Sequence, residues 1–336
     1  MNTAVKNTRL TDKIFETTDG SFAETALEIF RFQYQNNAEY RQFCNALNIN
    51  LGNIDTINKI PFLPISFFKT HTITTTEFIP EVVFESSGTT QTINSKHFVK
   101  DITVYEKSFS NAFQLFYGDA SEWCIIALLP SYLERKNSSL VMMADKLIAQ
   151  SKHPKSGFYL DELPQLQQVL SELEQQGQKT LLIGVTFALL DFAEQCPMPL
   201  HHTIVMETGG MKGRRKEMTR QQIHETLTNA FQIENIHSEY GMTELLSQAY
   251  SKGKGIFKCP PWMKILVREE DDPFAIYTVG EKKAVAGAIN VIDLANIYSC
   301  SFIATEDAGR LYAGGSFEVL GRLDNTDIRG CSLLVP

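Results

Sequence analysis

Ser86-Ser-Gly-Thr-Thr90 is the first segment of the sequence whose residue types suit chemistry. It lies between an expected strand and an expected helix. Glycine lets a ligand approach the backbone closely, and the surrounding hydroxyls and N–H groups can donate hydrogen bonds to a phosphate. A solvated turn rich in Ser and Thr explains the composition equally well, and the GxxxxGK[ST] pattern of a P-loop is absent. Taken alone, the segment leaves both interpretations open.

A second segment, His237-Ser-Glu-Tyr-Gly-Met-Thr-Glu244, places an aromatic ring beside a glycine and a carboxylate four residues after the ring. Tyr240, beside Gly241, can lie flat against a purine. Glu244 offers the oxygen ligands that Mg²⁺ prefers. A strand-to-helix turn with Thr243 as the helix N-cap is the plainer interpretation, and these residues alone favour it.

Later segments carry further charged or nucleophilic groups. Asp307 is expected in a turn, Ala304-Thr-Glu-Asp-Ala-Gly309, where its carboxylate can accept both hydroxyls of a ribose; a plain turn between strands is the alternative.

Two more segments lie near the C-terminus. Gly321-Arg-Leu-Asp324 can be a β-turn with a surface salt bridge. Arg329 lies close enough in sequence to lower the pKa of the Cys331 thiol. A small apolar residue in a terminal strand is the simpler explanation of Cys331.

Composition excludes several classes of protein. The chain has 336 residues, is 43% hydrophobic and 21% charged, and carries a net charge of −8. This charge argues against a general nucleic-acid or anionic-membrane surface. No signal peptide and no apolar run long enough to cross a bilayer is visible. The six cysteines are scattered without a CxxC pair, so we expect free thiols and a cytoplasmic location.

The hydrophobic pattern predicts an α/β fold that positions these segments. Continuous apolar runs are typical of buried strands, and helical periodicity between them predicts crossover helices. The expected strands are 81–84, 124–129, 180–183 and 202–206, and the expected helices are 104–116, 140–150, 164–175, 187–195 and 220–231. This alternation implies mostly parallel sheet with flanking helices, with ligands at the carboxyl ends of the strands.

Beyond Pro260 the pattern changes to short strands, expected at 263–267, 274–279, 286–293 and 316–320. Antiparallel pairing with tight turns is typical of such spacing. We therefore expect an α/β core over residues 1–260 and a smaller β-rich subdomain of the same core over 261–320. A short C-terminal tail with Cys331 is expected over 321–336.

The four chemistry-bearing segments, in this order, resemble the adenylate-forming superfamily of acyl-CoA synthetases, peptide-synthetase adenylation domains and firefly-type luciferases. The resemblance implies the fold of their N-terminal domain, with ATP and Mg²⁺ as cofactors. It implies that Glu244 is catalytic and holds Mg²⁺, that Tyr240 stacks on adenine and that Asp307 binds ribose. The ATP-binding residues that it implies are Ser86, Ser87, Gly88, Thr89, Thr90, Gly209, Gly210, Glu239, Tyr240, Gly241, Thr243, Asp307 and Arg322.

One branch of the superfamily fits better, the acyl-protein synthetases of bacterial luminescence systems, or LuxE family. The similar segments are Pro61-Phe-Leu-Pro-Ile-Ser-Phe-Phe-Lys69, Phe84-Glu-Ser-Ser-Gly-Thr-Thr90, Leu129-Pro-Ser-Tyr-Leu-Glu-Arg-Lys-Asn-Ser-Ser139, Thr208-Gly-Gly-Met-Lys-Gly-Arg214 and Arg329-Gly-Cys331. Phenylacetate–CoA ligases look like larger relatives. The resemblance covers almost the whole chain. It implies ATP-dependent conversion of a carboxylic acid, in that family a fatty acid, to acyl-AMP and transfer of the acyl group to Cys331.

The sequence departs from the superfamily pattern in places. Gln91 stands where many family loops carry a further glycine, and Lys96 only loosely matches the basic residue that follows the loop. Because the sequence ends at Pro336, we expect the C-terminal lid domain of the large ligases, with its catalytic lysine, to be absent. In the acyl-protein synthetases a cysteine near the C-terminus takes the acyl group itself, and Cys331 fits that role.

The resemblance further implies an acyl-accepting partner protein such as a fatty-acid reductase, and no nucleic acid or membrane span. Two alternatives stay open. One is an adenylating ligase that delivers acyl groups to CoA or a carrier protein. The other is a non-catalytic subunit that binds acyl groups or nucleotides.

Overall fold

A mixed sheet of thirteen strands runs through the molecule, a computed structural model that describes residues 10–86, 93–129, 137–160, 162–209, 218–280 and 283–323. The strands of its parallel half are β4 (Cys124–Leu128), β5 (Gly157–Phe158), β6 (Thr180–Val185), β7 (Thr203–Thr208) and β8 (His237–Tyr240). They pair in the order β8-β7-β6-β4-β5. All four pairings are parallel, so their carboxyl ends meet at one edge.

The other half of the sheet is antiparallel. Its strands are β9 (Ala249–Ser251), β10 (Phe257–Lys258), β11 (Met263–Arg268), β12 (Ile276–Tyr277), β13 (Ala284–Asp293), β14 (Phe302–Tyr312) and β15 (Phe317–Arg322). The order is β12-β11-β13-β14-β15-β10-β9, and β9 joins β8 of the parallel half. β1 (Leu63–Pro64) pairs with β14 in parallel, and β2 (Val82–Glu85) with β3 (Lys96–Val99) forms a separate two-stranded sheet.

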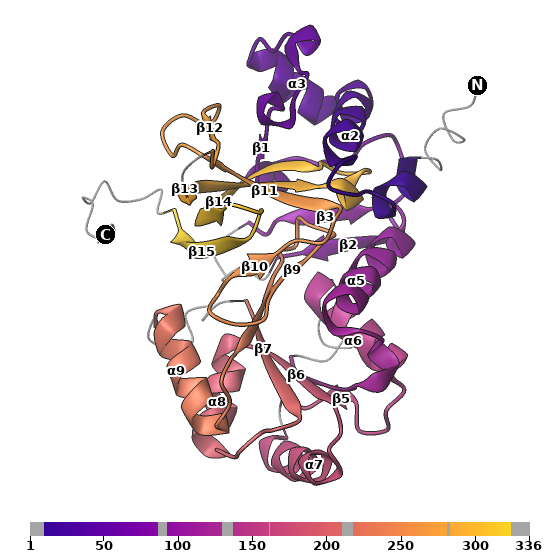
Figure 1. Ribbon diagram of the computed structural model, residues 1–336. Helices are drawn as coiled ribbons and strands as arrows, with labels where there is room; N and C mark the ends of the chain where they lie inside the picture. The colour runs from indigo at the N-terminus through magenta and orange to yellow at the C-terminus, as the bar shows by residue number, and fades with distance from the viewer. Residues whose placement is uncertain are drawn as a thin grey trace.

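Helices cover the two halves of the sheet (Figure 1). Those bounded in the described chain are α2 (Phe22–Asn36), α3 (Ala38–Ala46), α4 (Phe67–Thr70), α5 (Ile102–Tyr117), α6 (Ser139–Ser151), α7 (Leu163–Gln176), α8 (Thr186–Gln195) and α9 (Arg220–Phe231), with 3₁₀ turns η1 (Leu51–Asn53), η2 (Ile57–Lys59), η3 (Ala120–Glu122) and η4 (Leu294–Asn296). α7, α8 and α9 lie in the lobe of β5, β6 and β7, whereas α2 and α3 lie in the lobe of β11 and β13 (Figure 1). None of the helices in this part of the chain has the length and apolarity that a bilayer crossing requires.

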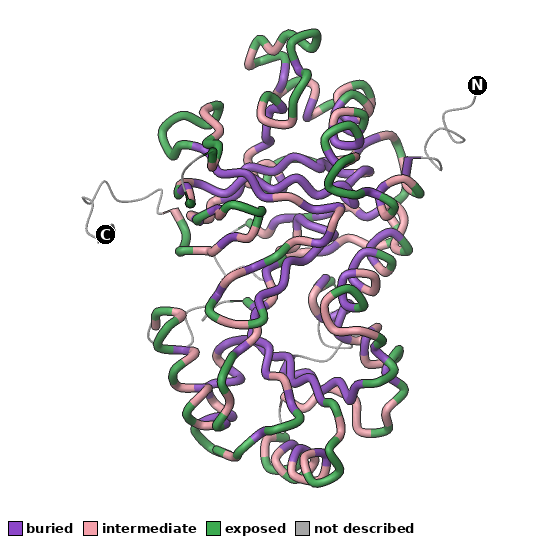
Figure 2. Tube along the Cα trace, in the orientation of Figure 1, coloured by how far each residue is buried: buried purple, intermediate pink, exposed green. Residues whose placement is uncertain are grey.

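Buried apolar runs explain the parallel strands. Every residue of β4 and of β6 is buried (Figure 2), which is typical of a sheet covered by helices on both faces. Gly184 lets β6 pack closely, because a Cβ there would lie 2.9 Å from Leu128 Cβ and 2.9 Å from Leu189 Cγ. The α/β fold and the strands and helices predicted for this half are confirmed.

The structure corrects several local predictions. Residues 304–309 are not a turn: they belong to β14, and a register shift between Ala308 and Gly309 gives the chain only a local irregularity. The Asp-Ala-Gly signal is overridden because β14 is paired on both sides, with β13 and β15. No helix begins at Thr243, because the chain turns back into β9. The strand β3 was not predicted.

A buried carboxylate, Asp293 at the end of β13, holds the segment that follows Glu244. Its Oδ2 accepts the backbone N–H groups of Leu246 (2.8 Å) and Ser247 (3.0 Å). Its Oδ1 accepts the Ser247 hydroxyl (2.6 Å) and the Ala295 N–H (3.1 Å). Burial raises the pKa of Asp293 to about 6, although all these donors favour the ionised form. The neighbouring Asn296 Nδ2 donates to the Glu244 carbonyl at 2.7 Å, so one buried cluster fixes this turn.

A second buried carboxylate, Glu207 of β7, ties three elements to the same edge of the sheet. It accepts the Ser238 hydroxyl of β8 (3.0 Å) and the Thr186 hydroxyl of α8 (3.2 Å). From α9, His224 Nε2 lies 3.0 Å and Arg220 Nε 3.8 Å from Glu207 Oε1. Burial alone favours a higher pKa for Glu207, but His224, Arg220 and Ser238 together bring that pKa below its ordinary value.

The change Asp293→Asn is expected to lower the free energy of unfolding by about 2–3 kcal/mol, since an amide has one acceptor oxygen and at least one buried N–H loses its partner. Urea unfolding followed by tryptophan fluorescence measures the loss. Asp272→Asn is the control, because Asp272 accepts one N–H, from Phe274, in an exposed turn; its effect should stay within about 1 kcal/mol. Equal stabilities for the two variants would contradict the role assigned to Asp293.

Glu207→Gln is expected to cost about 1–3 kcal/mol of unfolding free energy at pH 7. Since folding lowers the pKa of Glu207, the carboxylate stabilises the protein above the unfolded-state pKa of about 4.3. That contribution disappears as the pH falls through the folded-state pKa, so the gap between wild type and variant should narrow below about pH 4.3. Urea unfolding across pH tests this. Glu225→Gln, exposed on α9, should show no such narrowing, and a pH-independent gap for Glu207→Gln would contradict the interpretation.

Candidate active site

A cavity of about 760 Å³ lies at the carboxyl ends of β7 and β8. Its walls come from segments far apart in the sequence: the end of β2, the start of α6, the ends of β7 and β8, β14 and β15. The edge where parallel strands end is the usual place for a ligand in an open α/β sheet. The fold therefore brings the chemistry-bearing segments to one place.

Nine of the residues predicted for the site are described, and all nine line this cavity. They are Ser86, Gly209, Glu239, Tyr240, Gly241, Thr243, Glu244, Asp307 and Arg322. The other predicted positions, Ser87, Gly88, Thr89, Thr90, Gly210 and Cys331, lie outside the described residues. The roles given to all of these residues stay predictions.

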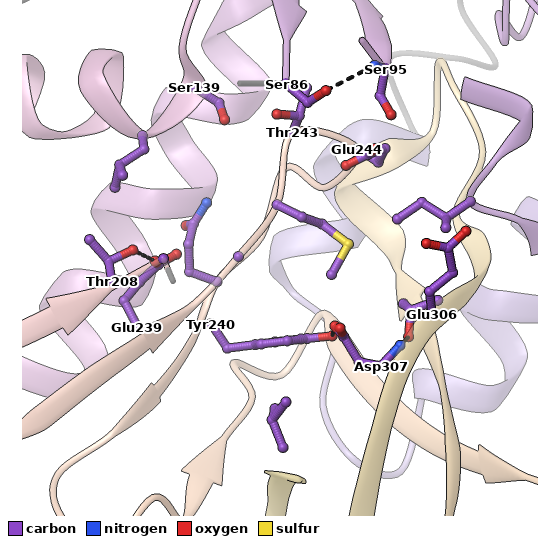
Figure 3. A pocket seen from close by; sticks show the side chains of 18 of the residues that line it. Ser86, Ser95, Ser139, Thr208, Glu239, Tyr240, Thr243, Glu244, Glu306 and Asp307 are labelled. Carbon is purple, nitrogen blue, oxygen red and sulfur yellow. Dashed lines mark hydrogen bonds between the residues drawn. The ribbon is translucent and has the colours of Figure 1, made fainter. Parts of the chain in front are cut away.

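Both flanks of the Ser/Thr/Gly segment line the same cavity as Glu244. Ser86 and Ser95 line the cavity together with Glu244, and the Ser95 N–H donates to the Ser86 hydroxyl at 2.9 Å (Figure 3). The Ser95 hydroxyl is also one of the groups that oppose the rise in the pKa of Glu244. The early segment and the late carboxylate therefore face the same space.

Glu244 is 6% exposed, and burial raises the pKa of its carboxyl group. Lys69 and Arg322, both lining the cavity, oppose this rise through their charge. Within the described ranges no cluster of three or more His, Cys, Asp or Glu residues could hold a metal ion by itself. Mg²⁺ commonly binds through one or two carboxylates together with substrate phosphates and water, so Glu244 fits a metal that arrives with a nucleotide.

Tyr240 and Asp307 meet across the cavity. The Tyr240 hydroxyl donates to Asp307 Oδ2 at 2.8 Å (Figure 3). The ring of Tyr240 is held by edge-to-face contacts with Phe257 and Phe317, at centroid distances of 6.0 and 5.5 Å. Burial raises the pKa of Asp307, and the Tyr240 hydroxyl partly offsets it. Asp307 keeps further acceptor sites, which a ribose diol can use.

One supporting residue, His97, was not predicted for the site. His97 of β3 is buried, and its Nδ1 donates to the Thr243 carbonyl at 2.9 Å. Burial lowers the pKa of His97 to about 4, so the ring is neutral at pH 7. Lys96 points elsewhere, with Nζ 3.6 Å from Glu85 Oε1, and it is not among the lining residues. A histidine with no motif around it offers no signal, because its partner lies 146 residues away.

Known proteins share this fold and this sequence pattern. The chain is 23% identical over 333 residues to the long-chain-fatty-acid–luciferin-component ligase of Aliivibrio fischeri, covering 91% of this chain and 85% of that protein. It is similar in structure to ATP-bound MatB from Rhodopseudomonas palustris, with a TM-score of 0.53 and 13% identity over 73% of this chain and 49% of MatB. An ATP-bound RpMatB-BxBclM chimera gives a TM-score of 0.53 at 12% identity, over 74% and 49%. The chain thus spans about half the length of these solved structures, and the likeness to them shows the fold.

The family comparison reaches further along the sequence. A model of the family described as acyl-protein synthetase, LuxE, matches residues 13–336. This range includes every segment that lines the cavity. The chain therefore belongs to the LuxE family of acyl-protein synthetases and is a ligase.

Proposed function

We propose that this chain uses ATP to convert a carboxylic acid into an acyl-adenylate and then transfers the acyl group to a cysteine thiol. The observation that carries the proposal is the meeting of Ser86, Tyr240, Glu244 and Asp307 on one cavity. Membership of the acyl-protein synthetase family supports the same reaction. The A. fischeri relative is named for a long-chain fatty acid, which supports a fatty acyl group here.

In the first step an oxygen of the substrate carboxylate attacks the α-phosphorus of ATP, and the bond to the pyrophosphate leaving group breaks. The carboxylate is already ionised at neutral pH, so no general base is needed. The chain must instead align the two reactants and compensate the phosphate charge. Tyr240 and Asp307 hold the nucleoside, while the Ser86 hydroxyl and the adjoining segment donate to the phosphates.

The charge of the cavity supports a divalent cation. The described lining contains six carboxylates, Glu85, Glu207, Glu239, Glu244, Glu306 and Asp307, against three basic residues, Lys69, Arg220 and Arg322. A polyphosphate that binds beside these carboxylates is repelled by them, so a cation must bind with it. Glu244 would hold Mg²⁺, which neutralises phosphate charge when it is bound. Lys69 and Arg322 add positive charge on the same side of the cavity.

In the second step a thiolate attacks the carbonyl carbon of the acyl-adenylate; a carbon–sulfur bond forms and AMP leaves with the electron pair of the broken carbon–oxygen bond. The described cysteines suit this poorly, because burial raises the pKa of Cys124 to about 11 and those of Cys44 and Cys259 to about 12. Cys331 is the proposed acceptor. The acyl group then passes to a partner protein, for which a fatty-acid reductase in the cytoplasm is the proposed type.

Glu244→Gln is expected to lower acid-dependent ATP–pyrophosphate exchange by about 10²–10³-fold, the usual loss when one preorganised electrostatic contact is removed. The amide keeps the shape of the side chain but loses its charge. Glu318→Gln, on β15 and paired with Arg310 outside the cavity, should exchange at the wild-type rate. Exchange at the wild-type rate in Glu244→Gln would refute the role of Glu244.

Incubation with ATP, Mg²⁺ and a labelled carboxylic acid should place a hydroxylamine-sensitive label on Cys331. Cys331→Ser should keep ATP–pyrophosphate exchange and lose the thioester, because only the second step needs the thiol. Cys259→Ser is the matched control and should keep both. Peptide mass mapping decides, and label on another cysteine would overturn the assignment. Acyl-CoA formation that persists in Cys331→Ser would favour a CoA ligase.

A further inference from the structure

The two faces of β8 divide the cavity. Successive residues of a strand point to opposite faces, so Tyr240 turns toward Asp307 while Glu239 turns away from it (Figure 3). Glu239 lies beside Thr208, on the far side of the strand from Asp307 (Figure 3). The lining residues Tyr105, Ser139, Thr208, Glu239 and Gln248 are here called the Glu239 subsite. Glu239 is the one member that the resemblance places among the ATP-binding residues, and the nucleotide contacts proposed above do not use it.

Glu239 and Gln248 gather around Gly241. A Cβ at residue 241 would lie 2.3 Å from Glu239 Oε1 and 3.3 Å from Gln248 Cγ. The absence of a side chain at Gly241 therefore leaves room for Glu239 and brings it near Gln248. The other carboxylate oxygen of Glu239, Oε2, accepts the Thr208 hydroxyl.

Gln248 lines this space and carries a buried acceptor that no described group satisfies. The residue is 4% exposed and lines the cavity, and its Oε1 has no hydrogen-bond partner among the described residues. Buried side-chain oxygens nearly always find a donor in native proteins, so an orphan at a cavity wall suggests that a ligand supplies one. Tyr105 does not satisfy it, because its hydroxyl donates to the Ser139 carbonyl at 3.0 Å.

Among the described residues, none that lines this subsite carries a positive charge. The three basic residues of the lining act elsewhere: Lys69 and Arg322 on Glu244, and Arg220 on Glu207. The titratable groups that face Glu239 are the phenols of Tyr105, Tyr117 and Tyr250. Burial raises the pKa of Glu239 to about 7, and only the Thr208 hydroxyl opposes the rise.

We infer that the Glu239 subsite receives a hydrogen-bond-donating group on the acyl chain, an amine or a hydroxyl, shared between Glu239 and Gln248. The substrate is then a fatty acid whose chain carries an amino or hydroxyl substituent, used in preference to the unsubstituted acid. The inference rests on the proposed acyl activation, since it places the acid across β8 from the nucleoside. It extends that proposal by naming the chemistry of the acyl group.

A panel of acids matched in chain length tests the inference by ATP–pyrophosphate exchange. The panel holds the unsubstituted acid and its hydroxy- and amino-substituted forms, with the substituent moved along the chain. For the best-placed substituent, kcat/KM should exceed that of the unsubstituted acid by at least about 10²-fold, because the unsubstituted acid leaves buried acceptors unpaired. A preference for amine over hydroxyl identifies an ammonium as the natural group, and the reverse preference identifies a hydroxyl.

Two variants locate the effect. Gln248→Leu should reduce the preference for the substituted acid by about tenfold or more. Glu239→Gln should lower kcat/KM for the amino-substituted acids only. Gln248→Leu should keep the wild-type KM for ATP. Gln221→Leu, exposed on α9, is the control and should change nothing.

The outcomes separate this inference from the proposed function. If wild type uses the unsubstituted acid as well as every substituted form, the inference is wrong while acyl activation stands. If Gln248→Leu and Glu239→Gln raise the KM for ATP and leave the acid preference intact, the subsite belongs to the nucleotide and the inference is wrong. If no acid of any class supports exchange, acyl activation and the inference both fail.

Discussion

Negative charge crowded into a partly buried space is the constraint on which the site depends. A carboxylate removed from water is stable only when donors or cations replace the lost hydration. In the fold, different groups compensate each buried carboxylate. Glu207 has His224 and Arg220 from α9, Asp307 has the Tyr240 hydroxyl, and Asp293 has backbone N–H groups. Elements distant in sequence are therefore tied together by the acids they must satisfy.

Glu239 and Glu244 are buried acids that the described residues compensate only in part. Burial raises the pKa of both. One hydroxyl opposes this rise for Glu239, whereas a hydroxyl, a backbone N–H and the charges of Lys69 and Arg322 oppose it for Glu244. They lie toward opposite sides of the segment that carries Tyr240 (Figure 3). In the two proposals, Glu244 binds the metal and the nucleotide, and Glu239 binds the acyl group.

The sheet explains how these partners meet. β8 and β14 are separated by β9, β10 and β15 in the strand order, yet the side chains of Tyr240 and Asp307 are in contact. The antiparallel strands must therefore curl back over the carboxyl ends of the parallel strands, as twisted sheets do. His97 and Asn296 hold the chain between Tyr240 and β9 in place from two other directions. The cavity is thus a product of sheet curvature, and no local segment forms it.

The parallel strands follow from local sequence alone, because the apolar runs at 124–129 and 180–183 must be buried. The sequence also determined which residue types are available to hold phosphate, ribose and metal. The three-dimensional pairing decided the rest. Ala304–Gly309 has the composition of a turn, but hydrogen bonding to neighbours on both sides makes it a strand. The contacts of Tyr240 with Asp307 and of His97 with Thr243 span 67 and 146 residues, so no local sequence pattern predicts them. The proximity of Glu239 and Gln248, which meet at Gly241, could not be predicted from the sequence. Whether a buried acceptor has a hydrogen-bond donor depends on its neighbours in space.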